Sequence, residues 1–247
     1  MRLKNKVAMI TGAGRGIGLA TALKFAREGA LLVLIDLDIE TLTQASAMVA
    51  DMGQEAIRFH ADITAEYDVT NLVAAAESHF GRVDILVNNA GFDRPGTSKR
   101  IDAKDLGAVL GVHVVGPFLL ARSVAPGMVA RKYGRIINVS SVYGKIGGKG
   151  ELAYSTAKAG MLGFTKSLAK ELGKYAVTVN AVLPGLIDTP AIRNLMAPQY
   201  RDQIINETPL NRIGQPDEIA SAIAFLASDE ASFITGATLE VSGGWNM

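Results

Sequence analysis

Short apolar runs alternate with longer amphipathic stretches along the whole chain of 247 residues. An apolar run bounded by turn residues is typical of a strand that is buried on both faces, as strands of parallel sheets are. No linker, repeat or low-complexity tract interrupts the alternation, so it predicts a single α/β domain whose parallel sheet is covered by helices on both faces. The expected strands are residues 7–11, 31–35, 56–60, 83–87, 134–140, 177–183 and 237–241.

The stretches between these runs show the 3.6-residue periodicity of helices with one buried face. Pro216, Asp217 and Glu218 mark one helix start, because proline fits the first turn and acidic side chains suit the positive end of a helix. By contrast, the segment at about 186–214 is polar and irregular. The expected helices run from the glycine-rich turn to residue 29, then over 39–52, 64–80, about 102–131, the stretch that Tyr154 opens, and 216–228.

Composition excludes several classes of protein and of site. The formal net charge is +1 without a long charge run, which disfavours a nucleic-acid surface. The lack of cysteine excludes disulfides, a cysteine nucleophile and thiolate metal ligands, and the three histidines match no metal-ligand spacing. Neither a signal peptide nor an apolar run of transmembrane length is evident. We therefore expect a cytoplasmic protein that holds no metal and acts away from membranes.

A glycine-rich turn joins the first expected strand to the first helix, and it reads Gly12-Ala13-Gly14-Arg15-Gly16-Ile17-Gly18. Glycines at such a turn let backbone N–H groups and the helix N-terminus face an anion. Asp36 ends the second strand, close to the offset of about 20 residues for an acid that binds a ribose. Together these features predict a dinucleotide site. The alternative is a structural turn with an incidental acid nearby.

Tyr154 and Lys158 are four residues apart in a stretch with helical periodicity, so their side chains project from neighbouring positions of one helix. A free phenol has a pKa of about 10, and an adjacent cation favours phenolate and lowers that pKa. Such a pair predicts a general acid/base that is poised near neutral pH. Taken alone, the same spacing also fits a surface pair on an amphipathic helix.

Five motifs, in order along nearly the whole chain, resemble those of the short-chain dehydrogenase/reductase family. They are Thr11-Gly12-x-x-x-Gly16-x-Gly18, Asn88-Asn89-Ala90-Gly91, Ser141, Tyr154-x-x-x-Lys158 and Pro184-Gly185. The tail that begins Arg212-Ile213-Gly214-Gln215-Pro216 is similar to the bacterial 3-oxoacyl-carrier-protein reductase branch. The resemblance implies a Rossmann-type, doubly wound, seven-stranded sheet of order 3-2-1-4-5-6-7 and a homotetramer. It also implies an NAD(P)(H)-dependent oxidoreductase that interconverts a carbonyl and a secondary alcohol.

The resemblance assigns roles to three polar residues. Tyr154 would exchange a proton with the substrate oxygen, and Lys158 would lower the pKa of that phenol and hold the nicotinamide ribose. Ser141 would hydrogen-bond the substrate oxygen; it matches the family spacing better than neighbouring Ser140 does. The alternative for Ser141 is a helix cap or a turn. Hydride would pass directly between the nicotinamide and the substrate carbon, while the protein supplies placement and protons.

Further cofactor contacts are implied by position in the family pattern. The turn at 88–91 is expected beside the ribose, or it only braces the sheet. The segment at about 186–214 follows the nicotinamide contacts and is expected to form a lid over the substrate. The implied cofactor-binding residues are Gly12, Arg15, Gly16, Ile17, Gly18, Asp36, Asp62, Ile63, Asn88, Ala90, Gly91, Tyr154, Lys158, Pro184, Gly185, Ile187 and Thr189.

Asp36 and Arg15 point to different cofactors. Asp36 would accept hydrogen bonds from both adenosine ribose hydroxyls and repel a 2′-phosphate, and Leu37 follows where NADP-using relatives often carry a basic residue. Arg15 stands where such relatives often place a phosphate-binding arginine, but it could instead cover the adenine or pair with a surface acid. Because a phosphate beside an unpaired carboxylate is costly, we favour NAD(H) over NADP(H).

His113 departs from the family pattern, in which an asparagine stands within Val-Asn-x-x-Gly; here the chain reads Val112-His113-Val114-Val115-Gly116. In the family, that asparagine props a water that links the lysine to solvent. Histidine also has a donor and an acceptor, so it could keep the relay, and a pKa near 6.5 would make the relay pH-sensitive. The alternative is a packed, neutral histidine that only fills space.

The sequences of the loops that should contact the substrate do not identify that substrate. A 3-oxoacyl thioester is the first expectation, and an NAD-dependent secondary-alcohol, sugar or hydroxy-acid dehydrogenase of the same family is the alternative. A regulatory NAD-binding protein with little catalysis is a more distant alternative, which the intact Ser141, Tyr154 and Lys158 disfavour.

Overall fold

A computed structural model describes residues 1–245 of the chain, and of Leu195 only the backbone. All neighbouring strands are parallel, and their order is β3-β2-β1-β4-β5-β6-β7. The predicted Rossmann-type topology and strand order are therefore confirmed. The strands are β1 (Val7–Thr11), β2 (Leu31–Asp36), β3 (Ala56–His60), β4 (Ile85–Asn88), β5 (Gly134–Val139), β6 (Val177–Pro184) and β7 (Thr238–Val241).

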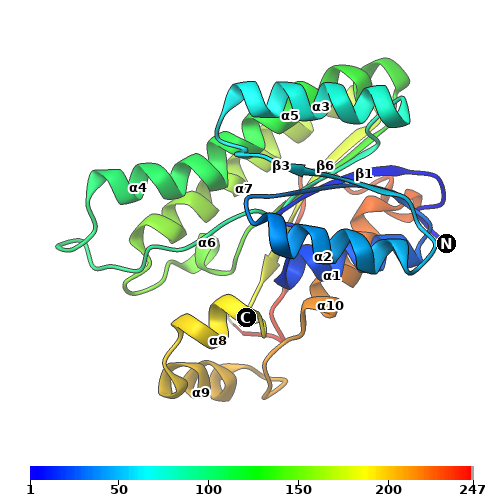
Figure 1. Cartoon of the computed structure of the whole chain (residues 1–247). Helices are drawn as coiled ribbons and strands as arrows, with labels where there is room; N and C mark the ends of the chain where they lie inside the picture. The colour runs from blue at the N-terminus through cyan, green and yellow to red at the C-terminus, as the bar shows by residue number, and fades with distance from the viewer. Residues whose placement is uncertain (246–247) are drawn as a thin grey trace.

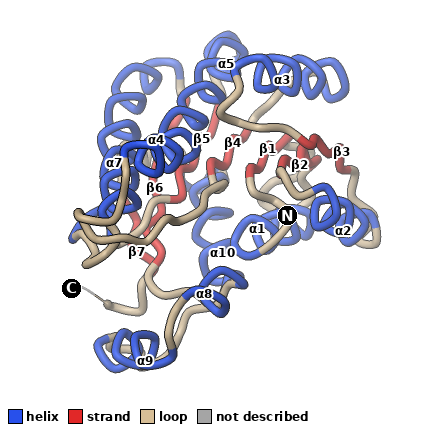
Figure 2. The backbone as a smooth tube through the Cα atoms, turned by 60° about the vertical axis from the view of Figure 1, so that its left-hand side comes forward, coloured by secondary structure: helices blue, strands red, loops and turns tan. Residues whose placement is uncertain are grey.

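Helices cover both faces of the sheet (Figure 1 and Figure 2). One face carries α1 (Gly16–Arg27), α2 (Ile39–Ala50) and α10 (Pro216–Ala227). The other face carries α3 (Glu66–Phe80), a continuous helical run of α4 (Ala103–Leu110), η1 (Gly111–Val115) and α5 (Gly116–Arg131), and α7 (Leu152–Leu172). The remaining short helices are α6 (Tyr143–Ile146), η2 (Gly173–Tyr175), α8 (Pro190–Leu195), α9 (Pro198–Glu207) and η3 (Asp229–Ala231).

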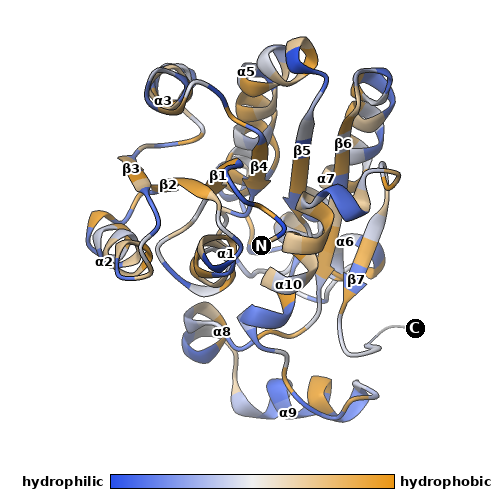
Figure 3. Ribbon diagram, turned by 90° about the vertical axis from the view of Figure 1, so that its right-hand side faces the viewer, coloured by the Kyte–Doolittle hydropathy of each residue, from blue (hydrophilic) through white to orange (hydrophobic). Residues whose placement is uncertain are grey.

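Each face of the sheet has its own apolar core. Successive strand residues point to opposite faces, so Ile10 packs with Phe25 and Ile223 on one side, while Met9 packs with Leu120 on the other. The strands are accordingly the most hydrophobic part of the fold in Figure 3, whereas α8 and α9 are largely hydrophilic. Burial on both faces explains why the strands read as continuous apolar runs.

The run Ala103–Arg131 differs from the expected regular helix, because η1 is a π-helical turn that contains His113. The run is also long and apolar enough to cross a bilayer by length and composition, although no stretch of that kind was expected. A core helix of a globular protein passes the same test, and 44% of its apolar window is buried inside the protein. The run lies along one face of the sheet in Figure 2.

The segment at about 186–214 is more regular than expected, because it contains α8 and α9. Both begin with proline, which suits the first helical turn, and the Thr189 side chain accepts a hydrogen bond from the N–H of Ile192 at the start of α8. In α9, Ile204 is the buried residue. Short helices with so little apolar surface have weak periodicity, which is why sequence reasoning missed them. Most other expected bounds differ from the observed ones by a few residues.

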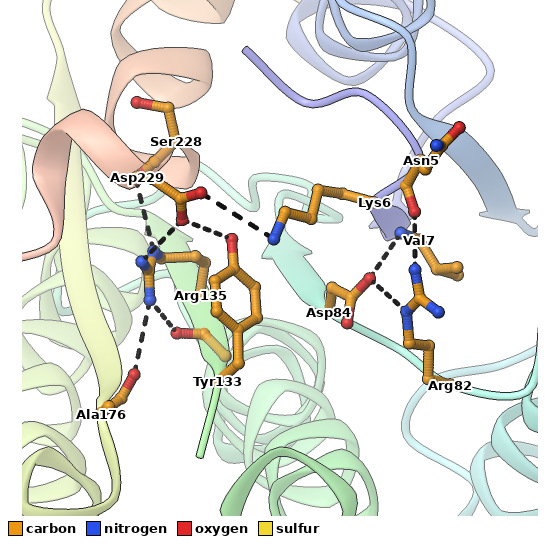
Figure 4. A network of polar contacts seen from close by, with 11 residues as sticks. Asn5, Lys6, Val7, Arg82, Asp84, Tyr133, Arg135, Ala176, Ser228 and Asp229 are labelled. Atoms are coloured by element: carbon orange, nitrogen blue, oxygen red, sulfur yellow. Dashed lines mark hydrogen bonds and ion pairs between the residues drawn. The ribbon is translucent and has the colours of Figure 1, made fainter. Parts of the chain in front are cut away.

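A network of polar contacts around two buried charged residues, Asp84 and Arg135, lies where β1, β4 and β5 begin (Figure 4). Arg135 is 4% exposed and donates to Asp229 Oδ1 at 3.1 Å and to the carbonyl oxygens of Gly134, Ala176 and Ser228. The Tyr133 hydroxyl donates to the same carboxylate oxygen at 2.9 Å. These bonds connect the start of β5 to the end of α10, at the edge opposite the glycine-rich turn.

Candidate active site

The glycine-rich turn follows β1 and is held against the turn after β4. Gly12 has a φ of +64° and Gly16 a φ of +56°, a region that favours glycine. A Cβ at Gly12 would lie 2.9 Å from Ala90 Cα, and a Cβ at Gly18 would overlap the carbonyl oxygen of Gly12. The turn therefore admits a close backbone approach, and α1 starts at Gly16 with no acidic residue in its first turn. Free N–H groups at such a helix start can bind an anion.

Asn89 and Thr11 hold this turn in place, and sequence reasoning did not assign them a role. Asn89 Nδ2 donates to the carbonyl oxygens of Thr11 and Gly12, at 2.9 and 3.1 Å. Thr11 Oγ1 accepts from the backbone N–H groups of Asn89 and Ala90 at 3.0 Å. The second asparagine of Asn88-Asn89 was the available signal, because a polar side chain directly after a buried strand needs partners.

Asp36 ends β2 beside the glycine-rich turn. Its Oδ2 accepts from the Gly14 N–H at 2.9 Å and its Oδ1 from the Asp38 N–H at 3.1 Å. Within residues 1–245 no cation pairs with Asp36, so the carboxylate keeps acceptor capacity. Arg15 precedes α1 with an extended backbone, and its side chain makes no capping hydrogen bond.

Two other predicted cofactor residues have structural partners. Asp62 Oδ1 accepts from the N–H and the hydroxyl of Thr64, both at 2.8 Å, so this carboxylate stabilises the turn before α3. Asn88 Nδ2 donates to Asn138 Oδ1 at 2.8 Å, and Asn138 Nδ2 donates to Thr165 Oγ1 at 2.9 Å. The latter bonds join β4, β5 and α7, so the turn at 88–91 does brace the sheet. Oδ1 of Asn88 is buried and remains free to accept a hydrogen bond.

The predicted residues of the lid lie close to the glycine-rich turn. A Cβ at Gly16 would be 3.5 Å from Thr189 Cγ2, in ordinary contact. Ile187 forms an isolated parallel bridge with Gly214 and is buried. At Gly185, a Cβ would be 2.8 Å from Ser242 Cα, so this position needs glycine. The carbonyl oxygen of Pro184 accepts from the N–H of Val142 at 3.1 Å, which ties the end of β6 to the segment after β5.

Ser141, Tyr154 and Lys158 meet where β5 ends. Ser141 follows β5; its Oγ accepts from the N–H of Tyr143 at 3.1 Å, as the turn alternative expects, and its hydroxyl also lies close enough to the Tyr154 phenol to lower the pKa of that phenol. Tyr154 and Lys158 lie in α7, and Lys158 Nζ is 5.5 Å from the centroid of the Tyr154 ring. Neighbouring Ser140 points elsewhere, because its hydroxyl donates to the Lys158 carbonyl oxygen at 2.8 Å. One serine thus faces the phenol and the other fastens β5 to α7.

The pKa values of this cluster differ from the expected ones. Burial raises the pKa of Tyr154 well above its ordinary value, and the hydrogen bond from Ser141 opposes this rise only in part. Burial lowers the pKa of Lys158 to about 7. Lys158 Nζ donates to the Val139 carbonyl oxygen at 2.6 Å. The expected lowering of the Tyr154 pKa by Lys158 is therefore wrong for the ligand-free protein, because desolvation outweighs a neighbouring ammonium that is itself only partly protonated at neutral pH.

His113 lies on η1 and is 3% exposed. Its Nε2 is 2.8 Å from the carbonyl oxygen of Phe92, and its ring packs edge-to-face on Tyr154 with centroids 5.5 Å apart. Burial, and secondarily the charge of Lys158, lowers the pKa of His113 to about 3. Of the two alternatives for this residue, the structure therefore favours the packed, neutral histidine over the pH-sensitive relay.

Asp93 and Glu151 form a carboxyl pair that sequence reasoning missed. Burial, followed by a hydrogen bond and repulsion from Asp93, raises the pKa of Glu151 to about 8. Glu151 precedes Tyr154 by one helical turn, and both carboxyl groups also raise the pKa of Tyr154. The pair comes together because the loop at Gly96 bridges to Glu151, a long-range contact without a sequence pattern.

Comparison with known proteins gives matches to a family profile, to two relatives and to a solved structure, each over nearly the whole chain. A sequence profile described as "Enoyl-(Acyl carrier protein) reductase" matches residues 12–246. The chain is 44% identical over 249 residues to a 3-oxoacyl-[acyl-carrier-protein] reductase of Synechocystis sp., covering 99% of this chain and 98% of that one. It is 40% identical over 248 residues to (2S)-[(R)-hydroxy(phenyl)methyl]succinyl-CoA dehydrogenase subunit BbsD of Thauera aromatica, covering 100% and 99%. A crystal structure of NAD+-bound xylitol dehydrogenase superposes with a TM-score of 0.93 at 34% identity, covering 99% and 100%.

Proposed function

Because the chain belongs to the short-chain dehydrogenase/reductase family and is thus an NAD(P)(H)-dependent oxidoreductase of CH–OH and C=O groups, we propose that it reduces the 3-oxo group of an acyl thioester. The observation that carries the proposal is the convergence of Ser141, Tyr154 and Lys158 at the end of β5. A hydrogen-bond donor, a phenol and a buried amine in this arrangement suit the protonation of a carbonyl oxygen.

Tyr154 is the proposed proton donor. In reduction, its O–H bond breaks and the proton passes to the carbonyl oxygen, which becomes the hydroxyl of the alcohol. Ser141 hydrogen-bonds the same oxygen and orients it. Lys158 has a pKa of about 7, so close to neutral pH it can return a proton to the phenolate. When bound, the nicotinamide supplies the hydride for the substrate carbon.

The residues around the glycine-rich turn fit a dinucleotide. Gly12 and Gly18 let the turn pack closely on its own backbone and on the turn after β4, which leaves the free N–H groups at the start of α1 to bind an anion. Asn88 Oδ1 is a buried acceptor without a partner within residues 1–245. The proposed contacts are those predicted from the sequence: Gly12, Arg15, Gly16, Ile17, Gly18, Asp36, Asp62, Ile63, Asn88, Ala90, Gly91, Tyr154, Lys158, Pro184, Gly185, Ile187 and Thr189.

NAD(H) is the proposed preference over NADP(H). Asp36 is fixed by two backbone N–H groups and pairs with no cation in the described part of the chain, so a 2′-phosphate would meet an uncompensated carboxylate. The NAD+-bound state of the xylitol dehydrogenase structure supports the same preference. We expect Asp36→Ser to shift the ratio of kcat/KM for NADPH over NADH upward by more than tenfold, and Arg15→Gln to change it little. An unchanged ratio in Asp36→Ser would contradict the preference.

The thioester substrate is supported by the activities for which two relatives are named. One acts on a 3-oxoacyl group carried by acyl carrier protein, and the other is a dehydrogenase of a hydroxylated succinyl-CoA. The two names describe a keto group and a hydroxyl group, respectively, on an acyl thioester. An NAD-dependent dehydrogenase of a secondary alcohol, sugar or hydroxy acid is the second candidate, which the likeness to xylitol dehydrogenase favours. A non-catalytic NAD-binding protein is disfavoured by the intact cluster around Tyr154.

We propose a cytoplasmic homotetramer of single-domain subunits, each with a lid at about 186–214. A groove between α5 and α7 supports self-association. Its walls include Phe118, Ala125, Val129, Phe164 and Leu168, and Phe118 is 46% exposed. An apolar groove of this kind on a helical face suits burial against a second copy. The acidic and polar surface of α9 suits a segment that is exposed to solvent until substrate binds.

The deciding experiment measures oxidation of NADH and of NADPH by absorbance with an acetoacetyl thioester as the substrate. Turnover with NADH that Tyr154→Phe abolishes is the expected result. Tyr143→Phe makes the same chemical change nearby and should retain most of the activity. Turnover with NADPH alone would refute the cofactor preference. No turnover with either cofactor would refute the thioester proposal and favour the alcohol or sugar dehydrogenase.

A further inference from the structure

Two loops lie side by side at one end of the molecule, next to α4 and α6 (Figure 1). The first is the segment 92–102 between β4 and α4, and the second is the turn 147–151 between α6 and α7. The backbone N–H of Gly96 donates to the carbonyl oxygen of Gly150 at 2.7 Å, and Gly96 forms an isolated parallel bridge with Glu151. The two loops therefore form one continuous piece of surface, although they are about 50 residues apart in the chain.

Both loops are anchored beside Tyr154. The first loop begins at Phe92, whose carbonyl oxygen is 2.8 Å from His113 Nε2, and the ring of His113 packs edge-to-face on Tyr154. The second loop ends at Glu151, about one helical turn before Tyr154 in the chain. The outer parts of the two loops therefore border the approach to the proposed proton donor.

The carboxyl groups of this region are engaged within it. Asp93 hydrogen-bonds Glu151, and both side chains are half-buried. Asp102 caps α4 by accepting from the N–H of Asp105 at 2.7 Å. The carboxylate of Asp105 lies 3.7 Å from Arg94 Nε. The local negative charge is therefore held by the loops and the first turn of α4.

Four cations of the same region remain exposed and without a carboxylate within 4.0 Å in the part of the chain that the structure describes. We call them the basic rim; they are Lys99, Arg100, Lys104 and Lys149. A tight turn gathers the first two, because the N–H of Arg100 donates to the carbonyl oxygen of Thr97 at 2.8 Å. The whole chain has a formal net charge of only +1, so this group is a local concentration of positive charge and not a general property of the surface.

The lid at 186–214 shows the opposite arrangement. Arg193 pairs with Asp188 at 2.7 Å, and Arg212 pairs with Glu218 at 2.6 Å. The cations of the lid are thus neutralised by their own neighbours, whereas those of the basic rim are available to an anion from outside the chain.

We propose that the basic rim binds the phosphate groups of coenzyme A, so that the substrate enters as a coenzyme A ester. This inference rests on the proposed thioester activity. Coenzyme A carries its thioester at one end of a long uncharged arm and a diphosphate and a 3′-phosphate at the other end. A carbonyl held at Tyr154 therefore leaves the phosphates outside the site, where the two loops lie. Arg100 offers a planar fork for two phosphate oxygens, and the lysines act as point charges.

An acyl carrier protein fits the basic rim less well. A stable protein interface buries about 800 Å² on each partner, whereas these cations occupy two short loops and one helix start. The paired cations of the lid do not extend the positive surface across the entrance. A small ligand with closely spaced phosphates matches such a confined group of charges. The relative of Thauera aromatica is likewise named for a coenzyme A ester.

Two thioesters with the same reacting group test the proposal. Acetoacetyl-coenzyme A has the phosphates, and acetoacetyl-N-acetylcysteamine lacks them. In the double variant Lys99→Glu/Arg100→Glu we expect the KM for the coenzyme A ester to rise roughly tenfold at low ionic strength with kcat kept, since the lost contacts are the same in the ground state and the transition state. The KM for the short thioester should not change.

Lys166→Glu/Lys170→Glu is the matched control, because it makes the same change of charge at exposed positions in the C-terminal half of α7. It should affect neither substrate. A similar rise in KM for both thioesters, or an unchanged KM for the coenzyme A ester in the rim variant, would overturn the inference. A loss confined to a thioester of acyl carrier protein would also overturn it, because the basic rim would then be a docking surface for a protein.

A binding measurement does not depend on turnover. Adenosine 3′,5′-bisphosphate resembles the nucleotide end of coenzyme A, and a saturating nicotinamide cofactor keeps it out of the proposed dinucleotide site. Calorimetric titration should show binding to the wild type that is roughly tenfold weaker in Lys99→Glu/Arg100→Glu and unchanged in Lys166→Glu/Lys170→Glu. No binding to the wild type, or equal affinity in the rim variant, would contradict the proposal. If neither thioester turned over, the proposed function would fail, while this titration would still decide whether the basic rim binds phosphates.

Discussion

Strand β5 has a buried polar cluster at each end, and the two clusters differ in how well their charges are paired. At its start, Arg135 has an opposite charge in Asp229 and three backbone acceptors around it. Where the strand ends, Lys158 has one backbone acceptor, and a buried nitrogen of His113 has no donor in the part of the chain that the structure describes. Both cations are 4% exposed, so the difference lies in their partners and not in their depth.

The comparison indicates which cluster serves stability and which serves chemistry. Removing one member of a paired buried cluster leaves its partners unsatisfied, so it destabilises the fold. An unpaired buried cation already costs free energy in the folded state, and its presence needs another explanation. Incomplete pairing with shifted pKa values is typical of active sites, where ligands complete the hydrogen bonds. Substitutions at the two ends of β5 should therefore have opposite effects.

The largest expected effect is on turnover in the cluster at the end of β5. Tyr154→Phe removes the proton donor but keeps the ring that packs on His113. We expect kcat to fall by about 10³-fold, since general acid catalysis contributes on the order of 10²- to 10⁴-fold. The free energy of unfolding should change by less than about 1 kcal/mol, because the aromatic packing remains. Steady-state kinetics and urea unfolding measure the two quantities, and a large loss of stability would remove the contrast between the clusters.

The next effect concerns stability alone, at the other end of the strand. Arg135→Met should lower the free energy of unfolding by about 2 kcal/mol, because it removes the hydrogen bonds that a guanidinium only 4% exposed makes to the carbonyl oxygens of Gly134, Ala176 and Ser228 and to the Asp229 carboxylate. The activity of the folded fraction should be unchanged. Arg122→Met is the matched control, since Arg122 and its partner Glu66 are exposed and such pairs contribute less than about 1 kcal/mol. Equal losses of unfolding free energy in the two variants would show that the buried network stabilises the fold no more than an exposed ion pair does.

Lys158→Met should change the free energy of unfolding in the opposite direction to Arg135→Met. It should stabilise the protein near pH 6 by about 2 kcal/mol. The pKa of Lys158 is lowered from 10.5 to about 7. Between these values the unfolded chain binds more protons than the folded protein, so the stability of the wild type rises with pH in that window. The gain of the variant should therefore shrink as the pH rises above 7. Urea unfolding at several pH values measures this gain, and catalysis should be lost throughout.

The control for this titration is Lys166→Met, which changes an exposed lysine on the same helix α7. Its effect on the free energy of unfolding should be small, because the side chain is exposed. If Lys158→Met destabilised the protein at pH 6, Lys158 would belong to a satisfied network like that of Arg135, and the comparison between the two ends of β5 would fail.

The sequence predicted the parts of the fold that depend on local pattern. Continuous apolar runs predicted the strands, because burial on both faces removes the alternation of polar and apolar residues. The order of the family motifs predicted that Ser141, Tyr154 and Lys158 form one cluster. It did not predict the π-turn at His113, because a change in helical pitch has no residue signature. It also gave the wrong direction for the Tyr154 pKa. Spacing reports which charges are neighbours, whereas desolvation depends on the whole surrounding structure.

The smallest expected effect concerns Glu151 and Asp93, the carboxyl pair beside Tyr154. Repulsion between these two carboxyl groups adds to the incomplete charge pairing at the end of β5. The pKa of Glu151 is raised from 4.5 to about 8, chiefly by burial and next by Asp93. Between these values the folded protein binds more protons than the unfolded chain, so the contribution of Glu151 to stability falls as the pH rises. Glu151→Gln removes this titration. Its stability relative to the wild type should increase by about 1 kcal/mol from pH 5 to pH 9, because partial exposure screens the effect.

Glu218→Gln provides the contrast for that measurement, because Arg212 and the N–H of Gln215 lower the pKa of Glu218 to about 2. Glu218 is thus ionised in both the folded and the unfolded chain throughout pH 5 to 9, and its removal should shift the free energy of unfolding by a constant amount. A difference between Glu151→Gln and the wild type that is equally constant would mean that Glu151 is ionised at neutral pH. The proton that Tyr154 exchanges would then have to pass beside a charged Glu151 carboxylate.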